Sequence, residues 1–277
     1  DLIFATDPDA DRIGVIVTDK TGEFITLTGN QVGVLLSEFI LRNKKLNGTL
    51  TDKGAIIKTI VTTSMLYPIA KGYGINVHDV LTGFKYIAEL IKDFEENNYY
   101  NEFLLGFEES YGYLSGTYAR DKDAVVAAML ITEMTADYKS KGMTLYDGLQ
   151  SLYQKYGYFM EKTHSLTFAG IDGSEKIQSI MNFFRETPPT EFAGMKVCRM
   201  WDVKSGIIKD FVKGTEEKLN LPSSDVFRYD LENNAWFAVR PSGTEPKIKF
   251  YFGVCEDSYS KSEAKISECI AELSKIV

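Results

Sequence analysis

Strand-like and helix-like patterns alternate along the middle of the chain, and this alternation constrains the fold more than any other feature of the sequence. β-branched or apolar runs occur at 55–61, 76–81 and 102–107. Apolar residues spaced three and four apart indicate helices at 64–72, 84–94 and 121–138, and a further helix is indicated at 144–156. Alternation at this spacing predicts a sheet with crossover helices on its faces, which is a three-layer α/β domain.

The pattern changes after about His164. A helix at 174–185 is broken by the prolines of Thr187–Thr190, strand-like runs follow at 196–203, 235–239 and 248–254, and an amphipathic helix closes the chain at 262–276. Strands and helices grouped in this way predict a smaller α+β C-terminal domain.

The N-terminal segment begins inside an apparent core element. Apolar strands are indicated at 2–6 and 13–18, and a helix at 31–43, but the chain opens at Asp1 without a methionine. We therefore expect a C-terminal piece of a longer protein. The first strands would then lack sheet neighbours, and an unpaired edge favours association with another chain.

Charge and cysteine content exclude several classes of function. The chain has 31 basic and 39 acidic residues, a net charge of −8, which argues against a broad nucleic-acid-binding or membrane-surface face. Three scattered cysteines and two histidines offer neither a disulfide framework nor a cysteine- or histidine-rich metal site. A reducing cytoplasmic location is expected.

The first loop that could carry chemistry is 7–12, with the sequence DPDADR. In an extended segment Asp7, Asp9 and Asp11 would share one face. Clustered carboxylates repel each other unless a cation holds them, and oxygen ligands suit Mg²⁺ or Ca²⁺. An EF-hand is excluded because Arg12 and Thr18 occupy the positions of its glycine and glutamate. A solvated acidic turn is the alternative.

The second loop, 106–112, follows an apolar strand. If it is extended, Glu108 and Ser110 point the same way, and a carboxylate with a hydroxyl can hold the hydroxyls of a polyol. A surface turn is the alternative. Further on, Arg120 and Lys122 precede the long helix, where the helix dipole does not explain basic residues. They face either an anion or a neighbouring aspartate.

The third loop, 240–247, lies between two strand runs and reads RPSGTEPK. Hydroxyls, backbone N–H groups exposed by glycine and an arginine fork are the groups that bind a phosphate dianion. A proline- and glycine-rich turn needs no ligand, but it does not need arginine, serine and threonine together. The composition of the loop favours phosphate.

Together these loops resemble those of the α-D-phosphohexomutases, most closely the bacterial phosphoglucomutase branch that also accepts phosphomannose. The matching pieces follow the family's order and spread over most of the chain: 7–12, 82–85, 106–112, 120–123 and 240–247. The resemblance implies four domains around a cleft. Residues 1–48 would end domain two, 49–165 would form domain three and 166–277 would form domain four.

The resemblance also implies roles for individual residues. Asp7, Asp9 and Asp11 would hold Mg²⁺, Arg12 would lie beside the transferring phosphoryl group, and Lys122 would contact an anion or carry a proton. The remaining implied substrate contacts divide into those to the sugar and its surroundings (Thr82, Gly83, Glu108, Ser110 and Arg120) and those to the unreactive phosphate (Arg240, Ser242, Gly243 and Thr244).

The implied reaction moves a phosphoryl group between C1 and C6 of a hexose phosphate through a hexose bisphosphate. The family carries that group on a serine within a Thr-Ala-Ser-His-Asn-Pro-like motif, which these 277 residues lack. Two readings stay open: an intramolecular phosphotransferase acting on glucose, mannose or pentose phosphates, or a sugar-phosphate-binding chain without turnover. A Mg²⁺-dependent phosphatase is disfavoured because no aspartyl nucleophile signature precedes the acidic loop.

Overall fold

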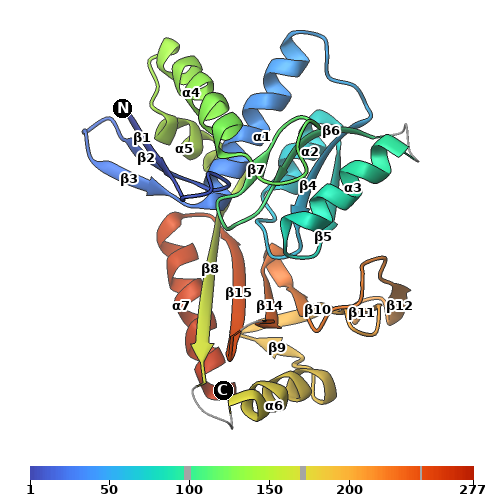
Figure 1. Cartoon of the computed structure of the whole chain (residues 1–277). Coiled ribbons are helices and arrows are strands. Elements are labelled where there is room, and N and C mark those ends of the chain that lie inside the picture. Colours follow the sequence, from blue (N-terminus) through green and yellow to red (C-terminus); the bar gives the residue numbers. More distant parts are fainter. Residues whose placement is uncertain (97–100, 169–172, 244) are drawn as a thin grey trace. The chain divides into compact units, whose positions relative to one another are not determined.

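Residues 1–96, 101–168, 173–243 and 245–277 are described by the computed structural model, and they form two units, Asp1–Tyr156 and Gly157–Val277 (Figure 1). Each unit has its own buried core and is described by itself. In the described part of the chain, no helix has the length and apolar character needed to cross a membrane. The assignment of residues 1–48 to a separate domain stays a prediction.

An antiparallel sheet opens the first unit. Its strands are β1 (Leu2–Thr6), β2 (Ile13–Thr18) and β3 (Phe24–Leu27), in the order β1-β2-β3. Thr6 pairs with Ile13, so that residues 7–12 form the turn of a hairpin. Ile13, Val15 and Val17 are buried in alternation, as expected for a sheet covered on one face. Helices α4 (Ala124–Ser140) and α5 (Leu145–Tyr156) pack against it.

The second sheet of this unit has helices on both faces. Strand β4 (Gly54–Thr59) is parallel to β5 (Asn76–Val80) and β6 (Glu102–Phe107), and β7 (Tyr113–Leu114) is antiparallel to β6. A Cβ on Gly106 would meet Ile87 of α3 (Phe84–Glu96), whereas Phe107 lies against Gly33 of α1 (Gly29–Leu46). Neighbouring strand residues face opposite sides, so α3 and α1 cover opposite faces.

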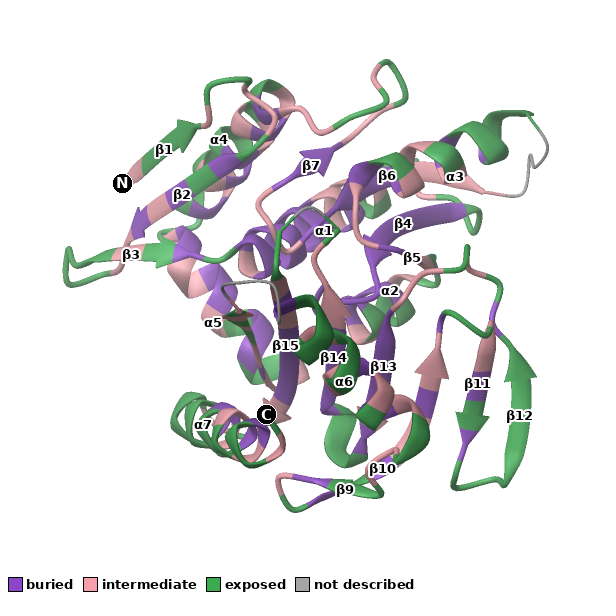
Figure 2. Cartoon of the chain, turned by 60° about the horizontal axis from the view of Figure 1, so that its bottom comes forward, coloured by how far each residue is buried: buried purple, intermediate pink, exposed green. Residues whose placement is uncertain are grey.

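Helix α2 (Leu66–Tyr73) packs beside α1. Every residue of β4 is buried (Figure 2), which is typical of a strand covered on both faces. The predicted three-layer α/β arrangement is confirmed.

Side-chain caps set where the helices begin. The Oγ1 of Thr28 accepts from the Gln31 amide at 3.2 Å, and the Gln31 side chain accepts from the Thr28 amide at 2.8 Å, which closes a capping box before α1. Asp123 accepts from the amides of Val125 and Val126 at 2.8 and 3.1 Å. Helix α4 therefore begins at Ala124 rather than at Asp121, because Asp123 is its cap.

The second unit is built on antiparallel strands. In the described part of the chain their order is β12-β11-β10-β13-β14-β15-β8, with β9 pairing with β10. Their bounds are β8 (Tyr158–Thr167), β9 (Glu191–Phe192), β10 (Met195–Asp202), β11 (Ile207–Asp210), β12 (Thr215–Lys218), β13 (Phe227–Leu231), β14 (Trp236–Pro241) and β15 (Lys247–Glu256), and a short 3₁₀ turn (Glu232–Asn234) precedes β14.

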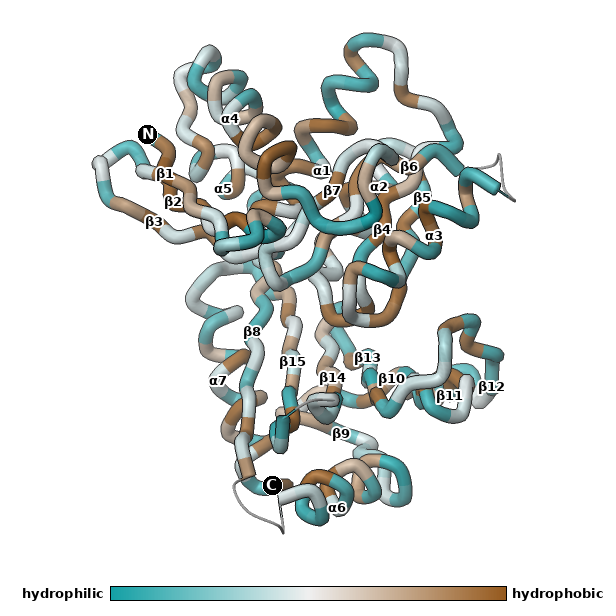
Figure 3. Tube along the Cα trace, in the orientation of Figure 1, coloured by the Kyte–Doolittle hydropathy of each residue, from teal (hydrophilic) through white to brown (hydrophobic). Residues whose placement is uncertain are grey.

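Helices α6 (Gly173–Glu186) and α7 (Tyr259–Ile276) complete this unit. Phe184 of α6 and Leu273 of α7 share one buried cluster with Tyr229, Phe237 and Phe250 of the strands. Helix α7 alternates hydrophilic and hydrophobic residues along its length (Figure 3), which is the pattern of a helix with one buried side. The predicted α+β C-terminal domain is confirmed.

Several strands of the second unit were not predicted. Strand β8 carries Glu161, Lys162 and His164 and has many half-exposed positions, so its hydrophobic pattern is weak. The β11–β12 hairpin is short, and every residue of β12 is exposed. Strand β13 was missed as well. Short or polar strands depend on their sheet neighbours, which sequence patterns do not reveal.

Among the described residues, strand β1 pairs only with β2 and is therefore an edge of its sheet. Ile3 and Phe4 are large apolar residues that remain exposed there. Such an edge favours pairing with a further strand. Association of chains through this segment stays a prediction.

Candidate functional site

The acidic loop, residues 7–12, is a tight turn and not the extended segment that we expected. Asp7 Oδ1 accepts from the amides of Asp11 at 3.2 Å and Arg12 at 3.0 Å, and Ala10 takes a left-handed φ of 54°. The turn nevertheless gathers Asp7, Asp9 and Asp11, each of which offers one carboxylate oxygen within 4.8 Å of the other two. The predicted juxtaposition of the three acids is present, although alternation along a strand is not its cause.

The two carboxylate oxygens of Asp11 have different surroundings. Its Oδ2 lies 2.8 Å from Lys122 Nζ. Its Oδ1 is buried without a hydrogen-bond partner among the described residues, and the nearest charged group given for it is Arg12 Nε at 4.0 Å. A buried carboxylate oxygen without a partner is costly unless something else binds it. Three carboxylates and one unpartnered oxygen form a donor set that fits a hard divalent cation.

Hydrogen bonds favour the charged forms of Asp7 and Lys122. The backbone amide of Arg12 holds the pKa of Asp7 below its usual range. Partial burial works to lower the pKa of Lys122, but its hydrogen bonds to Asp11 and Asp121 outweigh that effect and the pKa is raised. Lys122 is therefore a protonated ammonium that pairs with the acidic loop. This is the aspartate-pairing alternative considered for the basic residues before α4.

Backbone hydrogen bonds tie the acidic loop to its neighbours. Ile13 N donates to Tyr111 O at 3.1 Å, and Ala124 N donates to Ala10 O at 3.0 Å. Arg12 forms an isolated bridge with Gly112. A Cβ on Gly112 would lie 2.1 Å from Lys122 Cδ, so only glycine lets the lysine pass at this point. The acidic loop, the 106–112 loop and the start of α4 are thus held together.

The 106–112 loop follows β6 and turns at once, so the alternation expected for Glu108 and Ser110 does not apply. Glu108 is 6% exposed, and its Oε1 accepts from Gly83 N at 2.8 Å. Burial raises the pKa of Glu108 despite that hydrogen bond. The Ser110 hydroxyl is half-buried, and no described residue hydrogen-bonds to it. Thr82 lies next to Gly83 in the loop after β5, so the structure brings Thr82 and Gly83 close to Glu108; their role in sugar binding stays a prediction.

Two basic residues near this site, Arg120 and Lys85, contact groups outside the acidic loop. The Arg120 guanidinium pairs with Glu95 of α3 and donates to the carbonyl of Thr117 at 2.6 Å. It is exposed and anchors the segment before α4. Lys85 is exposed as well, with its Nζ 4.7 Å from the centre of the Tyr86 ring. The structure does not bring Arg120 to the acidic loop through any described contact.

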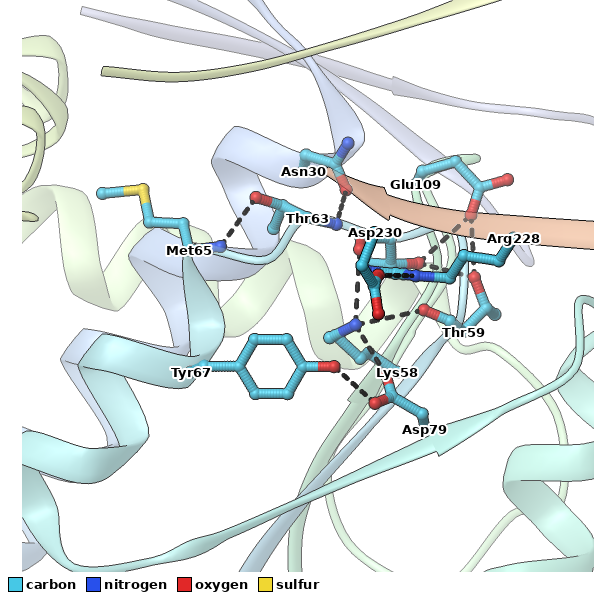
Figure 4. Close-up of polar contacts among 11 residues, drawn as sticks. Asn30, Lys58, Thr59, Thr63, Met65, Tyr67, Asp79, Glu109, Arg228 and Asp230 are labelled. Carbon is cyan, nitrogen blue, oxygen red and sulfur yellow. Dashed lines mark hydrogen bonds and ion pairs between the residues drawn. The ribbon is translucent and has the colours of Figure 1, made fainter. Parts of the chain in front are cut away.

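The loop that follows β4 lies at the carboxyl ends of the parallel strands, as the loop with Gly83 does, and it was not predicted from the sequence. Thr59 and Thr62 each lie 3.2 Å from Glu109 Oε2 through their hydroxyls (Figure 4). Lys58 is fully buried and pairs with Asp79 at 2.6 Å. Threonines at the end of a buried strand were the available signal, since ligands bind at the carboxyl ends of parallel strands.

The 240–247 loop joins β14 to β15 in the second unit. Ser242 N donates to Lys247 O at 2.7 Å, and Lys247 pairs with Glu245 at 2.7 Å. Arg240 is half-buried and forms no ion pair with a described carboxylate. Gly243 is exposed, with open space where a Cβ would lie. Thr244 lies outside the described residues.

The features of this loop suit an anion. Arg240 pairs across the strands with Lys249, which places two cations side by side. A pocket beside the loop is lined by Ser242 and Gly243 and by Ser174 and Gln178 of α6, but also by the carboxylates of Asp225 and Glu245 and not by Arg240, so the support for anion binding comes from the loop itself. An arginine without a carboxylate partner among the described residues, next to hydroxyls and free backbone, can bind a phosphoryl group.

Two family models match the chain. The model of the phosphoglucomutase/phosphomannomutase alpha/beta/alpha domain III matches residues 28–156, and the model of the C-terminal domain of the same family matches residues 197–266. The first match ends at Tyr156, where the first unit ends.

Individual proteins agree with this match. A phosphoglucomutase of Staphylococcus saprophyticus subsp. saprophyticus is 40% identical over 253 residues, which are 91% of this chain and 45% of the relative. Pp63/parafusin, a phosphoglucomutase of Paramecium solved in its open form, superposes with a TM-score of 0.65 at 20% identity, over 99% of this chain and 45% of that one.

A third solved structure is the N-acetylphosphoglucosamine mutase of Aspergillus fumigatus in complex with GlcNAc-6P and magnesium. Its TM-score is 0.53 at 14% identity, over 100% of this chain and 49% of that one. The chain thus spans about half the length of the proteins it matches, including 45% to 48% of curated relatives.

Proposed function

Because the chain belongs to the phosphoglucomutase/phosphomannomutase family, we propose that it supplies the metal-, sugar- and phosphate-binding loops of a phosphohexomutase. This isomerase interconverts glucose 1-phosphate and glucose 6-phosphate through a hexose bisphosphate. One observation carries the proposal: the acidic loop, Lys122 and the loop with Glu108 are joined by hydrogen bonds and an ion pair within the first unit.

Magnesium is the metal of this proposal. Asp7, Asp9 and Asp11 would hold it, and the unpartnered Asp11 Oδ1 supports that assignment. The Aspergillus neighbour was solved with magnesium and a sugar phosphate. When bound, the ion would supply positive charge that screens the transferring phosphoryl group.

The chain's own residues have distinct tasks in the reaction. Glu108 and Ser110 would hold sugar hydroxyls, with Thr82 and Gly83 beside them. Gly83 N–H already orients one Glu108 oxygen, which leaves the other free to accept from a sugar hydroxyl. Burial around Glu108 strengthens such a hydrogen bond because little water competes for it.

Charged residues complete the proposed machinery. Arg12 is exposed next to Asp11 and would contact the phosphoryl group in transfer. Lys122 would act as an anion contact rather than a proton carrier, since its ammonium is held by Asp11 and Asp121. Arg120 stays a weaker prediction because Glu95 already neutralises it.

A phosphoryl group binds separately to the 240–247 loop in this proposal, through Arg240, Ser242, Gly243 and Thr244. Arg240 supports the idea because no described carboxylate neutralises it. A cytoplasmic location is part of the proposal, and the three free cysteines support it.

A second candidate function is sugar-phosphate binding without turnover by the 277 residues alone. The sequence lacks the family's serine motif, and the reaction needs a phosphoryl carrier that persists between its two half-reactions. Specificity for mannose or pentose phosphates is an alternative to glucose.

A coupled assay for conversion of glucose 1-phosphate to glucose 6-phosphate, with Mg²⁺ and glucose bisphosphate, tests both candidates. We expect no turnover by the 277 residues and turnover after fusion to the N-terminal half of the staphylococcal relative. Turnover by the 277 residues alone would place the carrier within them. A fusion that folds and binds substrate but stays inactive with every hexose and pentose phosphate would refute the mutase proposal.

A further inference from the structure

We propose that Glu109 is a positioning residue, which locks the 106–112 loop so that Glu108 stays on Gly83. Its carboxylate Oε2 lies 3.2 Å from Thr59 Oγ1 (Figure 4). The same oxygen lies 3.2 Å from Thr62 Oγ1, and the two hydroxyls lie 2.7 Å from each other. The inference rests on the proposed function in so far as Glu108 is a sugar contact.

The threonine pair has few other ways to satisfy its hydroxyls. Thr59 ends β4, and both Thr59 and Thr62 are fully buried. The two hydroxyls have two hydrogens for three oxygen–oxygen contacts, so at least one hydroxyl donates to the carboxylate at 3.2 Å. Glu109 therefore links the end of β4 to the 106–112 loop.

The opposite side of the loop is fastened by its backbone. A Cβ on Gly29 would lie 2.2 Å from Glu109 O, and Tyr113 Oη donates to Gly29 O at 3.0 Å. Residues 109–113 thus lie tightly against the start of α1. With its backbone held there and its carboxylate held by the threonines, Glu109 has little freedom left.

This fastening acts on Glu108 because the two residues are adjacent. Glu108 Oε1 accepts from Gly83 N, in the loop after β5, while Glu109 Oε2 binds the loop after β4. Two neighbouring side chains therefore bind the ends of two parallel strands. Without the hydrogen bonds of Glu109 to the threonines, the turn would be free to rotate, and the hydrogen bond between Glu108 and Gly83 N would be lost more often. Precise placement of a binding group depends on such supporting contacts.

Four variants of the chain separate positioning from direct sugar contact. Glu109→Ala removes the acceptor, Glu109→Gln keeps an oxygen that can accept from both hydroxyls, and the Thr59→Val/Thr62→Val double variant removes the donors at nearly constant shape. Glu133→Ala, at an exposed glutamate of α4, is the matched control.

The first readout needs no ligand: hydrogen exchange of the Gly83 amide, which Glu108 protects. We expect exchange to accelerate roughly tenfold in Glu109→Ala and in the double threonine variant, as for loss of about one hydrogen bond's net stability. Glu109→Gln and Glu133→Ala should stay within about threefold of the parent chain. Adding Glu109→Ala to the double threonine variant should accelerate exchange no further.

The second readout is calorimetric binding of glucose 1-phosphate in the presence of Mg²⁺, with the same order of effects expected. If exchange at Gly83 is unchanged in both Glu109→Ala and the double threonine variant, the positioning role is refuted, whatever the binding result. If Glu109→Gln binds as poorly as Glu109→Ala while the threonine variant binds normally, Glu109 contacts the sugar directly and the proposal fails.

Failure of the proposed function would look different. In that case the parent chain would not bind glucose 1-phosphate at all, although the exchange pattern at Gly83 would follow the variants as expected. The positioning role of Glu109 would then stand without the sugar. Should Glu109→Ala fail to fold, the near-isosteric threonine variant and Glu109→Gln still decide the question.

Discussion

At the scale of single residues, the acidic turn has the most specific chemistry. Asp7, Asp9 and Asp11 lie together on a six-residue hairpin turn, and Lys122 neutralises only one of them. Repulsion among these carboxylates is relieved when a divalent cation binds.

Asp9→Asn is expected to weaken Mg²⁺ binding by roughly tenfold or more, equivalent to about 1.4 kcal/mol, because one charged ligand is lost. The parent chain should bind Mg²⁺ weakly. Calorimetric titration of both chains measures this, and Asp52→Asn, at an exposed aspartate outside the turn, is the control. Equal affinity of the parent and Asp9→Asn would remove Asp9 from the metal site.

Arg240→Ala is expected to weaken binding of glucose 1-phosphate by roughly 1.5–3 kcal/mol, the range for hydrogen bonds to charged groups. Any binding of free glucose should be unaffected, since it has no phosphate. Lys218→Ala, at an exposed lysine of β12, controls for the loss of net charge. A phosphosugar affinity as high in Arg240→Ala as in the parent chain would contradict the assignment.

His78 should make stability depend on pH. Burial lowers its pKa below the ordinary 6.5, although its hydrogen bond with Asn101 opposes this, and its buried Nε2 has no hydrogen-bond partner among the described residues. The unfolded chain then binds more protons than the folded chain between the two pKa values, so the free energy of unfolding falls as pH falls below about 6.5.

Chemical denaturation of the parent chain and of His78→Gln checks this at several pH values from about 5 to 8, the range in which histidine titrates. The free energy of unfolding should depend less on pH in the variant than in the parent chain. A parent profile that His78→Gln does not flatten would show that other groups cause the pH dependence.

The sequence pointed to loops that the structure brings together, but it did not reveal the contacts that support them. Asp7 lies with Asp9 and Asp11 on one turn, and Glu108 accepts from Gly83 N, whereas the roles that the resemblance implies for them stay predictions. Glu109 and Thr59 were missed, since their hydrogen bond joins loops 50 residues apart in sequence. Such a contact follows from the order of strands in the sheet. The idea that alternation gathers the carboxylates was wrong in its cause, because a tight turn does so instead.

At the scale of elements, the approach of α1 to the central sheet depends on Gly33. A Cβ there would lie 2.2 Å from the Phe107 ring, which is fully buried on β6. Neither group can move far, because interiors are close-packed.

Gly33→Ala is therefore expected to lower the free energy of unfolding by about 1–3 kcal/mol through overpacking. Gly72→Ala in α2 is the matched control: its nearest neighbour would be Tyr156 Oη at 3.6 Å, so it should be neutral or gain up to about 1 kcal/mol from helix propensity. Urea denaturation measures both. An equal change in the free energy of unfolding for the two variants would show that the contact between α1 and Phe107 can accommodate an added methyl group.

Helices and long apolar strands followed from the sequence, whereas several shorter strands did not. The continuous apolar run of β4 and the apolar spacing of α3 are strong signals. Strands β12 and β13 owe their conformation to the strands beside them. The start of α4 also moved from its expected position, because a capping side chain and not the apolar pattern fixes it.

At the scale of the whole chain, the candidate loops are divided between two units with separate cores. The first unit has the acidic turn and the loop with Glu108, and the second has the loop with Arg240. With a net charge of −8 we expect no broad basic face for nucleic acid. In the proposed function, anion binding therefore comes from local groups such as Lys122 and Arg240.

The most direct test of this account is a calorimetric titration of glucose 1-phosphate into the 277-residue chain with Mg²⁺ present. We expect saturable binding that Glu108→Gln weakens by roughly tenfold, since a buried carboxylate acceptor is lost. Free glucose should bind far more weakly than the phosphosugar. Absence of binding to the parent chain, or undiminished binding by Glu108→Gln, would contradict the claim that these residues form a hexose phosphate site.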